Sequence, residues 1–117
     1  MALSGINIYQ NILIVRKSYI LLYEILTVME ILELEKEIIE IIQEVCIHQE
    51  VEEVVSGNFY PGNFIMSQVL VSIFSQIEIK TGITIPNDCY IFHDQKTKKQ
   101  LNIKEAATKL LKLSKNE

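Results

Sequence analysis

A serine near the middle of the chain is the residue best suited to covalent chemistry. Ser67 follows a loop that contains Pro61 and Gly62, and it precedes an amphipathic run that ends at Gly82. A serine at the start of a helix can carry a phosphate ester, because the first-turn N–H groups and the helix dipole favour negative charge there. The ordinary alternative is an N-cap, the commonest role of serine at a helix start. Both interpretations predict a helix that begins at Ser67.

The remaining polar residues form no catalytic or metal-binding pattern. His48 and His93 lack a second ligand at metal spacing and a nearby nucleophile with an orienting acid. Cys46 and Cys89 match no metal or redox spacing, which predicts two reduced thiols, with Cys46 in the core. The glycines make no phosphate-binding motif. The chain is therefore predicted not to be an enzyme, and no metal is expected.

Composition limits the partners of the chain. It has 117 residues, the size of one domain, and a net charge of −4, which argues against nucleic-acid binding. The apolar run from Ile12 to Leu34 is interrupted by charged residues too often for a transmembrane segment. The N-terminus lacks the order of regions found in a signal peptide. These features predict a cytoplasmic protein.

The first half of the chain reads as helix. No Gly or Pro lies between Ile6 and Ser56, and Ser18 is a plausible N-cap, with a break near residues 33–35. The first 17 residues fit helix or strand; helix is favoured because the chain offers no clear strand partner. The apolar face of this segment is wider than one neighbouring helix needs. This face therefore needs a further partner: a longer bundle formed by the chain itself, another protein, or a second copy that binds through residues 18–34.

The second half alternates loops and short helices. A helical turn is expected within residues 50–55, a helix over 67–81 that ends at Gly82, a short helix within 87–92, and a final helix after Asn102. Glu105 completes a capping box with Asn102. Phe59, Tyr60 and Phe64 are expected to pin the loop before Ser67 to the core. The buried stripes are predicted to be Leu70, Ile73, Phe74 and Ile77 in the first of these helices, and Ile103, Ala106, Ala107, Leu110 and Leu111 in the last.

Residues from about 35 to 113 resemble the acyl/peptidyl carrier protein family. Ser67 lies 19 positions before Pro86, as the family's attachment serine does, and Phe59 lies eight before Ser67. The segment IEIKTGITIP resembles the end of the family's second helix, while IFHD and LNIKEAATKLL resemble its third and fourth helical regions. The family motif Asp-Ser-Leu is replaced here by Met66-Ser67-Gln68.

The resemblance implies an all-α fold with a four-helix acyl-carrier-like bundle over residues 35–117. The extra apolar helical segment over residues 1–34 is predicted from the sequence pattern, and the region before Glu30 has no counterpart in a minimal carrier protein. The resemblance further implies that Ser67 holds a covalent 4'-phosphopantetheine arm that carries acyl or aminoacyl thioesters, as in fatty acid or polyketide biosynthesis. The partners would be a phosphopantetheinyl transferase and acyl-transfer or synthase enzymes. The alternative is a divergent interaction module without the prosthetic group, which associates with itself or with a partner through its N-terminal helix.

Overall fold

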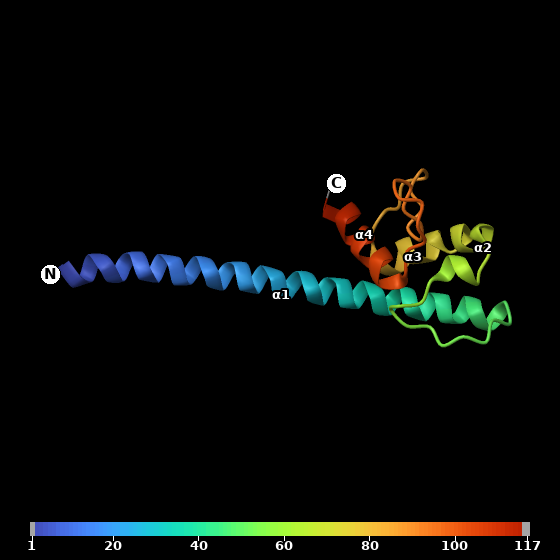
Figure 1. Ribbon diagram of the computed structural model, residues 1–117, viewed down its shortest axis with the longest axis horizontal. Coiled ribbons are helices and arrows are strands. Elements are labelled where there is room, and N and C mark those ends of the chain that lie inside the picture. Colours follow the sequence, from blue (N-terminus) through green and yellow to red (C-terminus); the bar gives the residue numbers. More distant parts are fainter. Residues whose placement is uncertain (1, 116–117) are drawn as a thin grey trace. The chain divides into compact units, whose positions relative to one another are not determined.

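The computed structural model describes residues 2–115, and it describes the side chains of residue 12 and residues 14–115. Over this range the chain is helical and contains no β-strand, which confirms the predicted all-α class (Figure 1). The four-helix carrier-like arrangement stays a prediction. The elements are α1 (Ala2–His48), the 3-10 turn η1 (Pro61–Asn63), α2 (Ser67–Ser72), α3 (Phe74–Thr81) and α4 (Ile103–Lys115).

Helix α1 is longer and more regular than the sequence indicated. It passes through Ser18 and through residues 33–35 without interruption, so the predicted N-cap and the predicted break are both wrong. The absence of Gly and Pro from Ile6 onward explains the continuity through these positions. The half-buried Glu35 does not end the helix; its carboxylate lies close against Gly57 of the following loop. Helix α1 begins at Ala2, so it includes residues 2–17, for which the sequence pattern fitted both helix and strand and helix was favoured.

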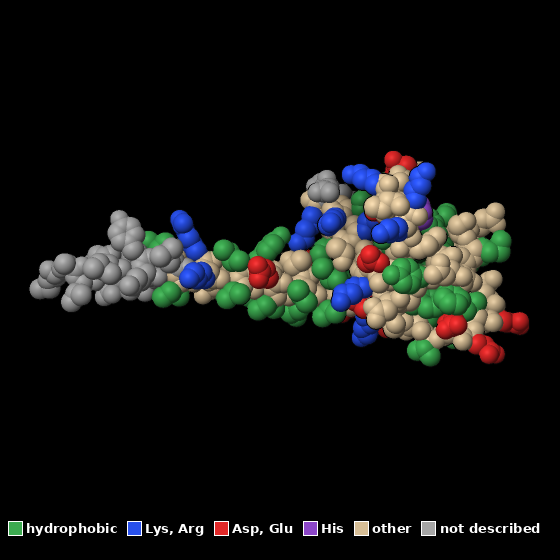
Figure 2. Space-filling view, viewed as in Figure 1, with side chains coloured by type: hydrophobic (Ala, Val, Ile, Leu, Met, Phe, Trp, Pro, Cys, Tyr) green, Lys and Arg blue, Asp and Glu red, His purple; other side chains and the backbone are tan. Residues whose placement is uncertain are grey.

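The chain divides into two compact units, residues 1–30 and residues 31–117. In the first unit, the side chains described from Ile12 onward are nearly all exposed, including most of its large apolar residues (Figure 2). The second unit contains the hydrophobic core and Ser67. The division predicted from sequence, 1–34 and 35–117, stays a prediction.

The core of the second unit joins the C-terminal half of α1 to α3, α4 and the connecting loops. Ile38, Ile42 and Cys46 of α1 are fully buried, as Ile77 of α3 and Leu110 of α4 are. Every apolar residue that the sequence assigned to the inner face of α4 is buried. The capping box is present: the Glu105 N–H donates to Asn102 Oδ1 at 2.8 Å, and the Asn102 N–H donates to Glu105 Oε1 at 3.0 Å.

The helix predicted over residues 67–81 is two helices, α2 and α3, separated at Ile73. The Ile73 N–H donates to the Leu70 carbonyl at 3.2 Å, and the Ser72 hydroxyl donates to the Val69 carbonyl at 2.5 Å. This side chain to backbone bond competes with regular helical pairing. Of the predicted stripe, Leu70, Ile73 and Ile77 are buried and Phe74 is half-buried. Gly82 ends α3 in the left-handed conformation, with φ of 73°.

Two short helical segments predicted in loops are absent. Residues 51–56 have no regular secondary structure. The chain turns after the end of α1 at His48, where Glu50 is in the left-handed region (φ 59°) and the Val51 N–H donates back to the Cys46 carbonyl. Residues 87–92 form turns instead of a helix, with Ile91 and Phe92 fully buried. Phe59 is buried and holds the loop before Ser67 to the core as expected, whereas Phe64, which stacks on Phe59 at 5.1 Å, is 47% exposed. Tyr60 is exposed.

Candidate functional site

Ser67 is the first residue of α2, and its side chain is exposed. The N-cap is Met66, which makes no side-chain capping bond; its carbonyl accepts from the N–H groups of Val69 and Leu70 at 3.0 and 3.1 Å. The interpretation of Ser67 as an N-cap is therefore wrong. Because α2 has only six residues, its dipole is smaller than that of the continuous helix expected from sequence. The features of Ser67 that bear on function are therefore its accessible hydroxyl and the surface around it.

A hollow of about 470 Å³ lies beside Ser67. Its walls combine apolar surface from Ile65 and Val71 with polar side chains that can donate and accept hydrogen bonds. None of the lining residues is acidic. The complete lining is Gly62, Ile65, Ser67, Val71, Tyr90, His93, Gln95 and Gln100. Such a surface suits a neutral, flexible chain that contains both amide and alkyl groups.

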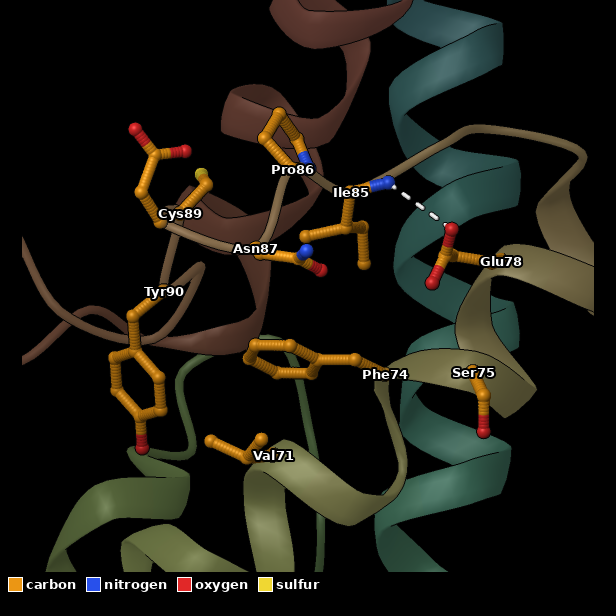
Figure 3. A pocket seen from close by; sticks show the side chains of 10 residues that line it. Val71, Phe74, Ser75, Glu78, Ile85, Pro86, Asn87, Cys89 and Tyr90 are labelled. Carbon is orange, nitrogen blue, oxygen red and sulfur yellow. Dashed lines mark hydrogen bonds between the residues drawn. The ribbon is translucent and has the colours of Figure 1, made fainter.

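A second pocket, of about 400 Å³, shares Val71 and Tyr90 with the first. Figure 3 shows it with Phe74 on α3 and with Ile85, Pro86 and Cys89 on the segment that follows Gly82. The Ile85 N–H donates to Glu78 Oε2 at 3.3 Å and ties that segment to α3. Because the two pockets have two lining residues in common, they adjoin at Val71 and Tyr90.

Three aromatic rings support the boundary between the pockets. The ring centroid of Phe74 lies 5.7 Å from that of Tyr90 and 6.1 Å from that of Phe92, while Tyr90 and Phe92 meet edge to face at 6.2 Å. Burial raises the pKa of the Tyr90 hydroxyl above its usual value. The hydroxyl therefore keeps its proton near neutral pH and can donate a hydrogen bond to a carbonyl oxygen.

The loop that supplies Tyr90 and His93 is held by α4. Lys109 Nζ donates to the carbonyls of Tyr90 and His93 at 3.1 and 3.2 Å. Asp94 closes the next turn: its carboxylate accepts from the Lys96 N–H at 3.0 Å and from the Thr97 hydroxyl at 2.9 Å. These bonds, the first above all, hold the pKa of Asp94 below its usual value. The polar wall beside Ser67 is thus fixed by several charge-assisted bonds.

The other residues considered from sequence lie apart. His48 is exposed at the end of α1, and Cys46 is fully buried in the core, where burial raises the pKa of its thiol. Within residues 2–115, no three His, Cys, Asp or Glu side chains are grouped closely enough to hold a metal ion. The structure does bring His93 and Ser67 to one hollow, and Cys89 to the neighbouring pocket.

Sequence reasoning missed Tyr90, Gln95 and Gln100 as neighbours of Ser67. They come from a loop more than 20 positions away, and the isolated bridge between His93 and Gln100 is what brings that loop back on itself. No periodicity marks such residues, because their positions depend on tertiary contacts with α4. The signal in the sequence that this loop is part of the core is the apolar pair Ile91 and Phe92. Both residues are buried in the structure.

Comparisons with known proteins leave the family open. No protein-family model matches the chain, and neither the curated proteins nor the solved structures contain a match. Across the described part of the chain, no helix has an apolar stretch long enough to cross a membrane.

Proposed function

We propose that the chain is a carrier protein that holds acyl or aminoacyl intermediates as thioesters on a phosphopantetheine arm at Ser67. The observation that carries the proposal is the position of the exposed Ser67 hydroxyl beside a mixed polar and apolar hollow that adjoins a second pocket. The spacing of 19 positions from Ser67 to Pro86 supports it from the sequence.

The surroundings of Ser67 fit the arm by chemistry. A pantetheine chain alternates amides with alkyl carbons, and the hollow offers Gln95, Gln100 and Tyr90 for the amides and Ile65 and Val71 for the alkyl part. When bound, the arm supplies the thiol that carries the cargo. The protein supplies accessibility at Ser67, a surface along which the arm rests, and a protonated Tyr90 hydroxyl as a hydrogen-bond donor.

The adjoining pocket fits a small apolar cargo. Phe74, Ile85 and Pro86 line it, and its volume is about 400 Å³. Withdrawing an acyl group from water into this pocket gains free energy in proportion to the apolar area covered, at roughly 25 cal/mol per Å². In this arrangement the carrier shields its acyl cargo from water until a partner enzyme binds. No side chain of the carrier acts as an acid or base.

Modification would have to proceed without the acidic residue that precedes the serine in the family motif. Met66 occupies that position and is 67% exposed. The exposed side of α2 and α3 offers Gln68, Ser72 and Gln76, and the half-buried Glu78 is the one acidic residue of these two helices. We propose that partner enzymes of this chain recognise a surface with little negative charge.

Intact-mass spectrometry tests the proposal. The full chain is coexpressed with a broad-specificity phosphopantetheinyl transferase, and the expected result is a gain of one phosphopantetheine mass. Ser67→Ala abolishes the gain, whereas Ser75→Ala, at an exposed serine that lines the second pocket, leaves it unchanged. Circular dichroism of both variants establishes that the fold is retained. A wild-type mass that does not change, with Ser67 accessible, contradicts the proposal.

The second candidate function is an interaction module without the prosthetic group. It is favoured by the large apolar side chains exposed on α1, among them Leu21, Ile25 and Val28 at 55–59%. A module of this kind is indifferent to Ser67→Ala. It loses its function when the apolar face is made polar, for example by Leu21→Lys or Val28→Lys, because an unpaired charge is costly to bury.

A further inference from the structure

The exposed part of α1 carries a regular apolar seam. Val15, Tyr19, Leu22, Leu26 and Met29 follow one another at alternating steps of four and three residues, the spacing of the core positions in a coiled coil. Their exposed fractions run from 49% for Leu26 to 69% for Tyr19. The seam therefore lies on one face of the helix and is open to solvent.

The surface along this seam has the form of a coiled-coil socket. A hollow of about 590 Å³ is lined by Tyr19, Leu22, Tyr23 and Leu26, which stand at relative positions 0, 3, 4 and 7. Four residues with this arrangement form the hole that receives one side chain of a facing helix. Ile20 and Glu24 complete its margin. The occupant expected from this geometry is an apolar side chain of another helix.

Charge along the segment selects the direction of that helix. Arg16 and Lys17 lie at one end of the seam, and Glu30 lies at the other. Two copies side by side in the same direction would place like charges together at both ends. In the opposite direction, Arg16 of each copy lies near Glu30 of the other, while Leu22 meets Leu26 and Tyr19 meets Met29. Antiparallel pairing therefore satisfies the apolar seam and the charges at once.

We propose that two copies of this chain associate through an antiparallel helix pair formed by residues 15–30, with Leu26 of each copy seated in the socket of the other. The pairing is independent of Ser67 and of its modification. A second apolar row, Leu21, Ile25 and Val28, lies beside the seam and remains exposed in such a pair. Two pairs can stack through it, so dimers and tetramers are the expected species.

Sedimentation equilibrium of the full chain over micromolar concentrations tests the association. Wild-type protein sediments as a dimer or tetramer, and Leu26→Glu weakens association by at least about a hundredfold, because it places a charge in the seam. Ile47→Glu is the matched control: Ile47 is exposed to 67% on the same helix and lies outside the seam and its socket, so the same substitution leaves association unchanged. A wild-type monomer at high micromolar concentration overturns the proposal.

A charge exchange tests the direction. In the antiparallel pair, Arg16→Glu and Glu30→Arg each weaken association by about tenfold, since each creates two like-charge contacts, and the double variant recovers most of the loss. A parallel pair predicts no recovery, because each position faces its own copy. Both residues lie outside the hydrophobic core, so the test remains valid if Leu26→Glu perturbs the helix.

A membrane surface is the competing occupant. Vesicles of phosphatidylcholine and phosphatidylglycerol are mixed with the full chain and separated by flotation. Binding to the vesicles by a chain that stays monomeric in their absence, with loss of binding in Leu26→Glu, assigns the seam to lipid and overturns the proposal. Wild-type oligomers that do not float with the vesicles support it.

Discussion

The ring of Phe74 on α3 lies 5.7 Å from the ring of Tyr90, and the two residues come from either side of the segment that connects α3 to the loop of residues 86–100. Tyr90 lines both the hollow beside Ser67 and the neighbouring pocket, and Phe74 lines the pocket. The contact is therefore where the core of the second unit and the candidate site meet. A change in one ring alters stability and pocket shape together.

Tyr90→Ala is expected to lower the free energy of unfolding by about 2 kcal/mol, because a half-buried ring and its contacts with Phe74 and Phe92 are lost. Tyr90→Phe keeps the rings and removes only the hydroxyl, so its stability should stay close to that of the wild type. Urea unfolding followed by circular dichroism measures both. Equal losses in the two variants would contradict this account, since they would assign the effect to the hydroxyl.

The capping box at the start of α4 gives the second prediction. Asn102→Ala removes the Oδ1 that accepts from the Glu105 N–H at 2.8 Å, and we expect a loss of about 1 kcal/mol in the free energy of unfolding. Asn102→Asp retains an acceptor and should be nearly neutral. Thermal unfolding of the two variants distinguishes them. A loss as large in Asn102→Asp as in Asn102→Ala would mean that the cap is not the source of stability.

The success of the sequence predictions followed the range of the interactions that build each element. Helix α4 could be predicted in detail because its cap, its apolar stripe and its lysines all lie within residues 102–115. The same holds for Gly82, whose left-handed conformation is the local way to end a helix. The break at Ile73 also has a local cause, the bond from the Ser72 hydroxyl to the Val69 carbonyl, but it was not predicted. A serine hydroxyl can bond to several nearby backbone groups, so the sequence does not show which bond it makes.

Elements that depend on distant partners could not be predicted. Residues 87–92 were expected to be helical, yet Lys109 Nζ binds the Tyr90 and His93 carbonyls from 16 or more positions away, and the Leu101 N–H binds the Phe92 carbonyl. For the same reason Ser67 could be singled out from its spacing, whereas Gln95 and Gln100 beside it could not. A single-sequence pattern holds no information on such pairs.

The close approach of Glu35 to Gly57 gives the third prediction. A Cβ at position 57 would overlap the Glu35 carboxylate, whose Oε2 is buried and has no hydrogen-bond partner in the described structure. Gly57→Ala should therefore destabilise the protein by about 1–2 kcal/mol. Gly62→Ala is the control: the group it meets is the amide of Gln100, an exposed side chain that can turn away, and the cost should be under about 0.5 kcal/mol.

A double-mutant cycle tests whether the loss of stability in Gly57→Ala is caused by overlap with the Glu35 side chain. In the Glu35→Ala background the overlap is gone, so Gly57→Ala should become nearly neutral and the coupling energy should be about 1 kcal/mol. Chemical unfolding of the four proteins gives the cycle. Additive losses would mean that position 57 is restricted by its backbone instead of by Glu35.

The ion pair between Glu40 and Lys80 gives a pH-dependent prediction. Lys80 Nζ donates to Glu40 Oε2 at 2.6 Å and lowers the pKa of Glu40 below its ordinary value of 4.5. A lowered pKa in the folded state contributes stability that is present above 4.5 and is lost as pH falls through the folded pKa. The raised pKa of Lys80 contributes stability that is lost only at strongly alkaline pH.

Lys80→Met should therefore be less stable than the wild type at neutral pH, and the difference should disappear as the solution is acidified through the pKa of Glu40. The difference should also shrink with added salt, because both side chains are partly exposed. Urea unfolding at pH 7 and at acidic pH, in low and high salt, measures it. A difference that persists unchanged in acid would assign the effect to packing of the lysine stem.

The two cysteines provide a probe of the proposed cargo site. Cys46 is fully buried and its thiol pKa is raised by burial, whereas Cys89 is half-buried and lines the pocket that contains Phe74 and Ile85. Iodoacetamide should therefore label Cys89 in the folded protein and leave Cys46 unlabelled until the chain unfolds. Peptide mass mapping after brief labelling measures the two rates separately. Rapid labelling of Cys46 in the native state would contradict the described core.

Cargo on the arm should then slow the labelling of Cys89. An acyl chain that enters the pocket from Ser67 covers the thiol, so protein loaded with an acyl thioester should react several-fold more slowly than protein that carries the arm alone. Ser67→Ala, treated in the same way, cannot be loaded and should keep the unprotected rate. An unchanged rate in fully loaded protein would place the cargo outside this pocket while leaving attachment at Ser67 intact, because the intact mass reports attachment independently.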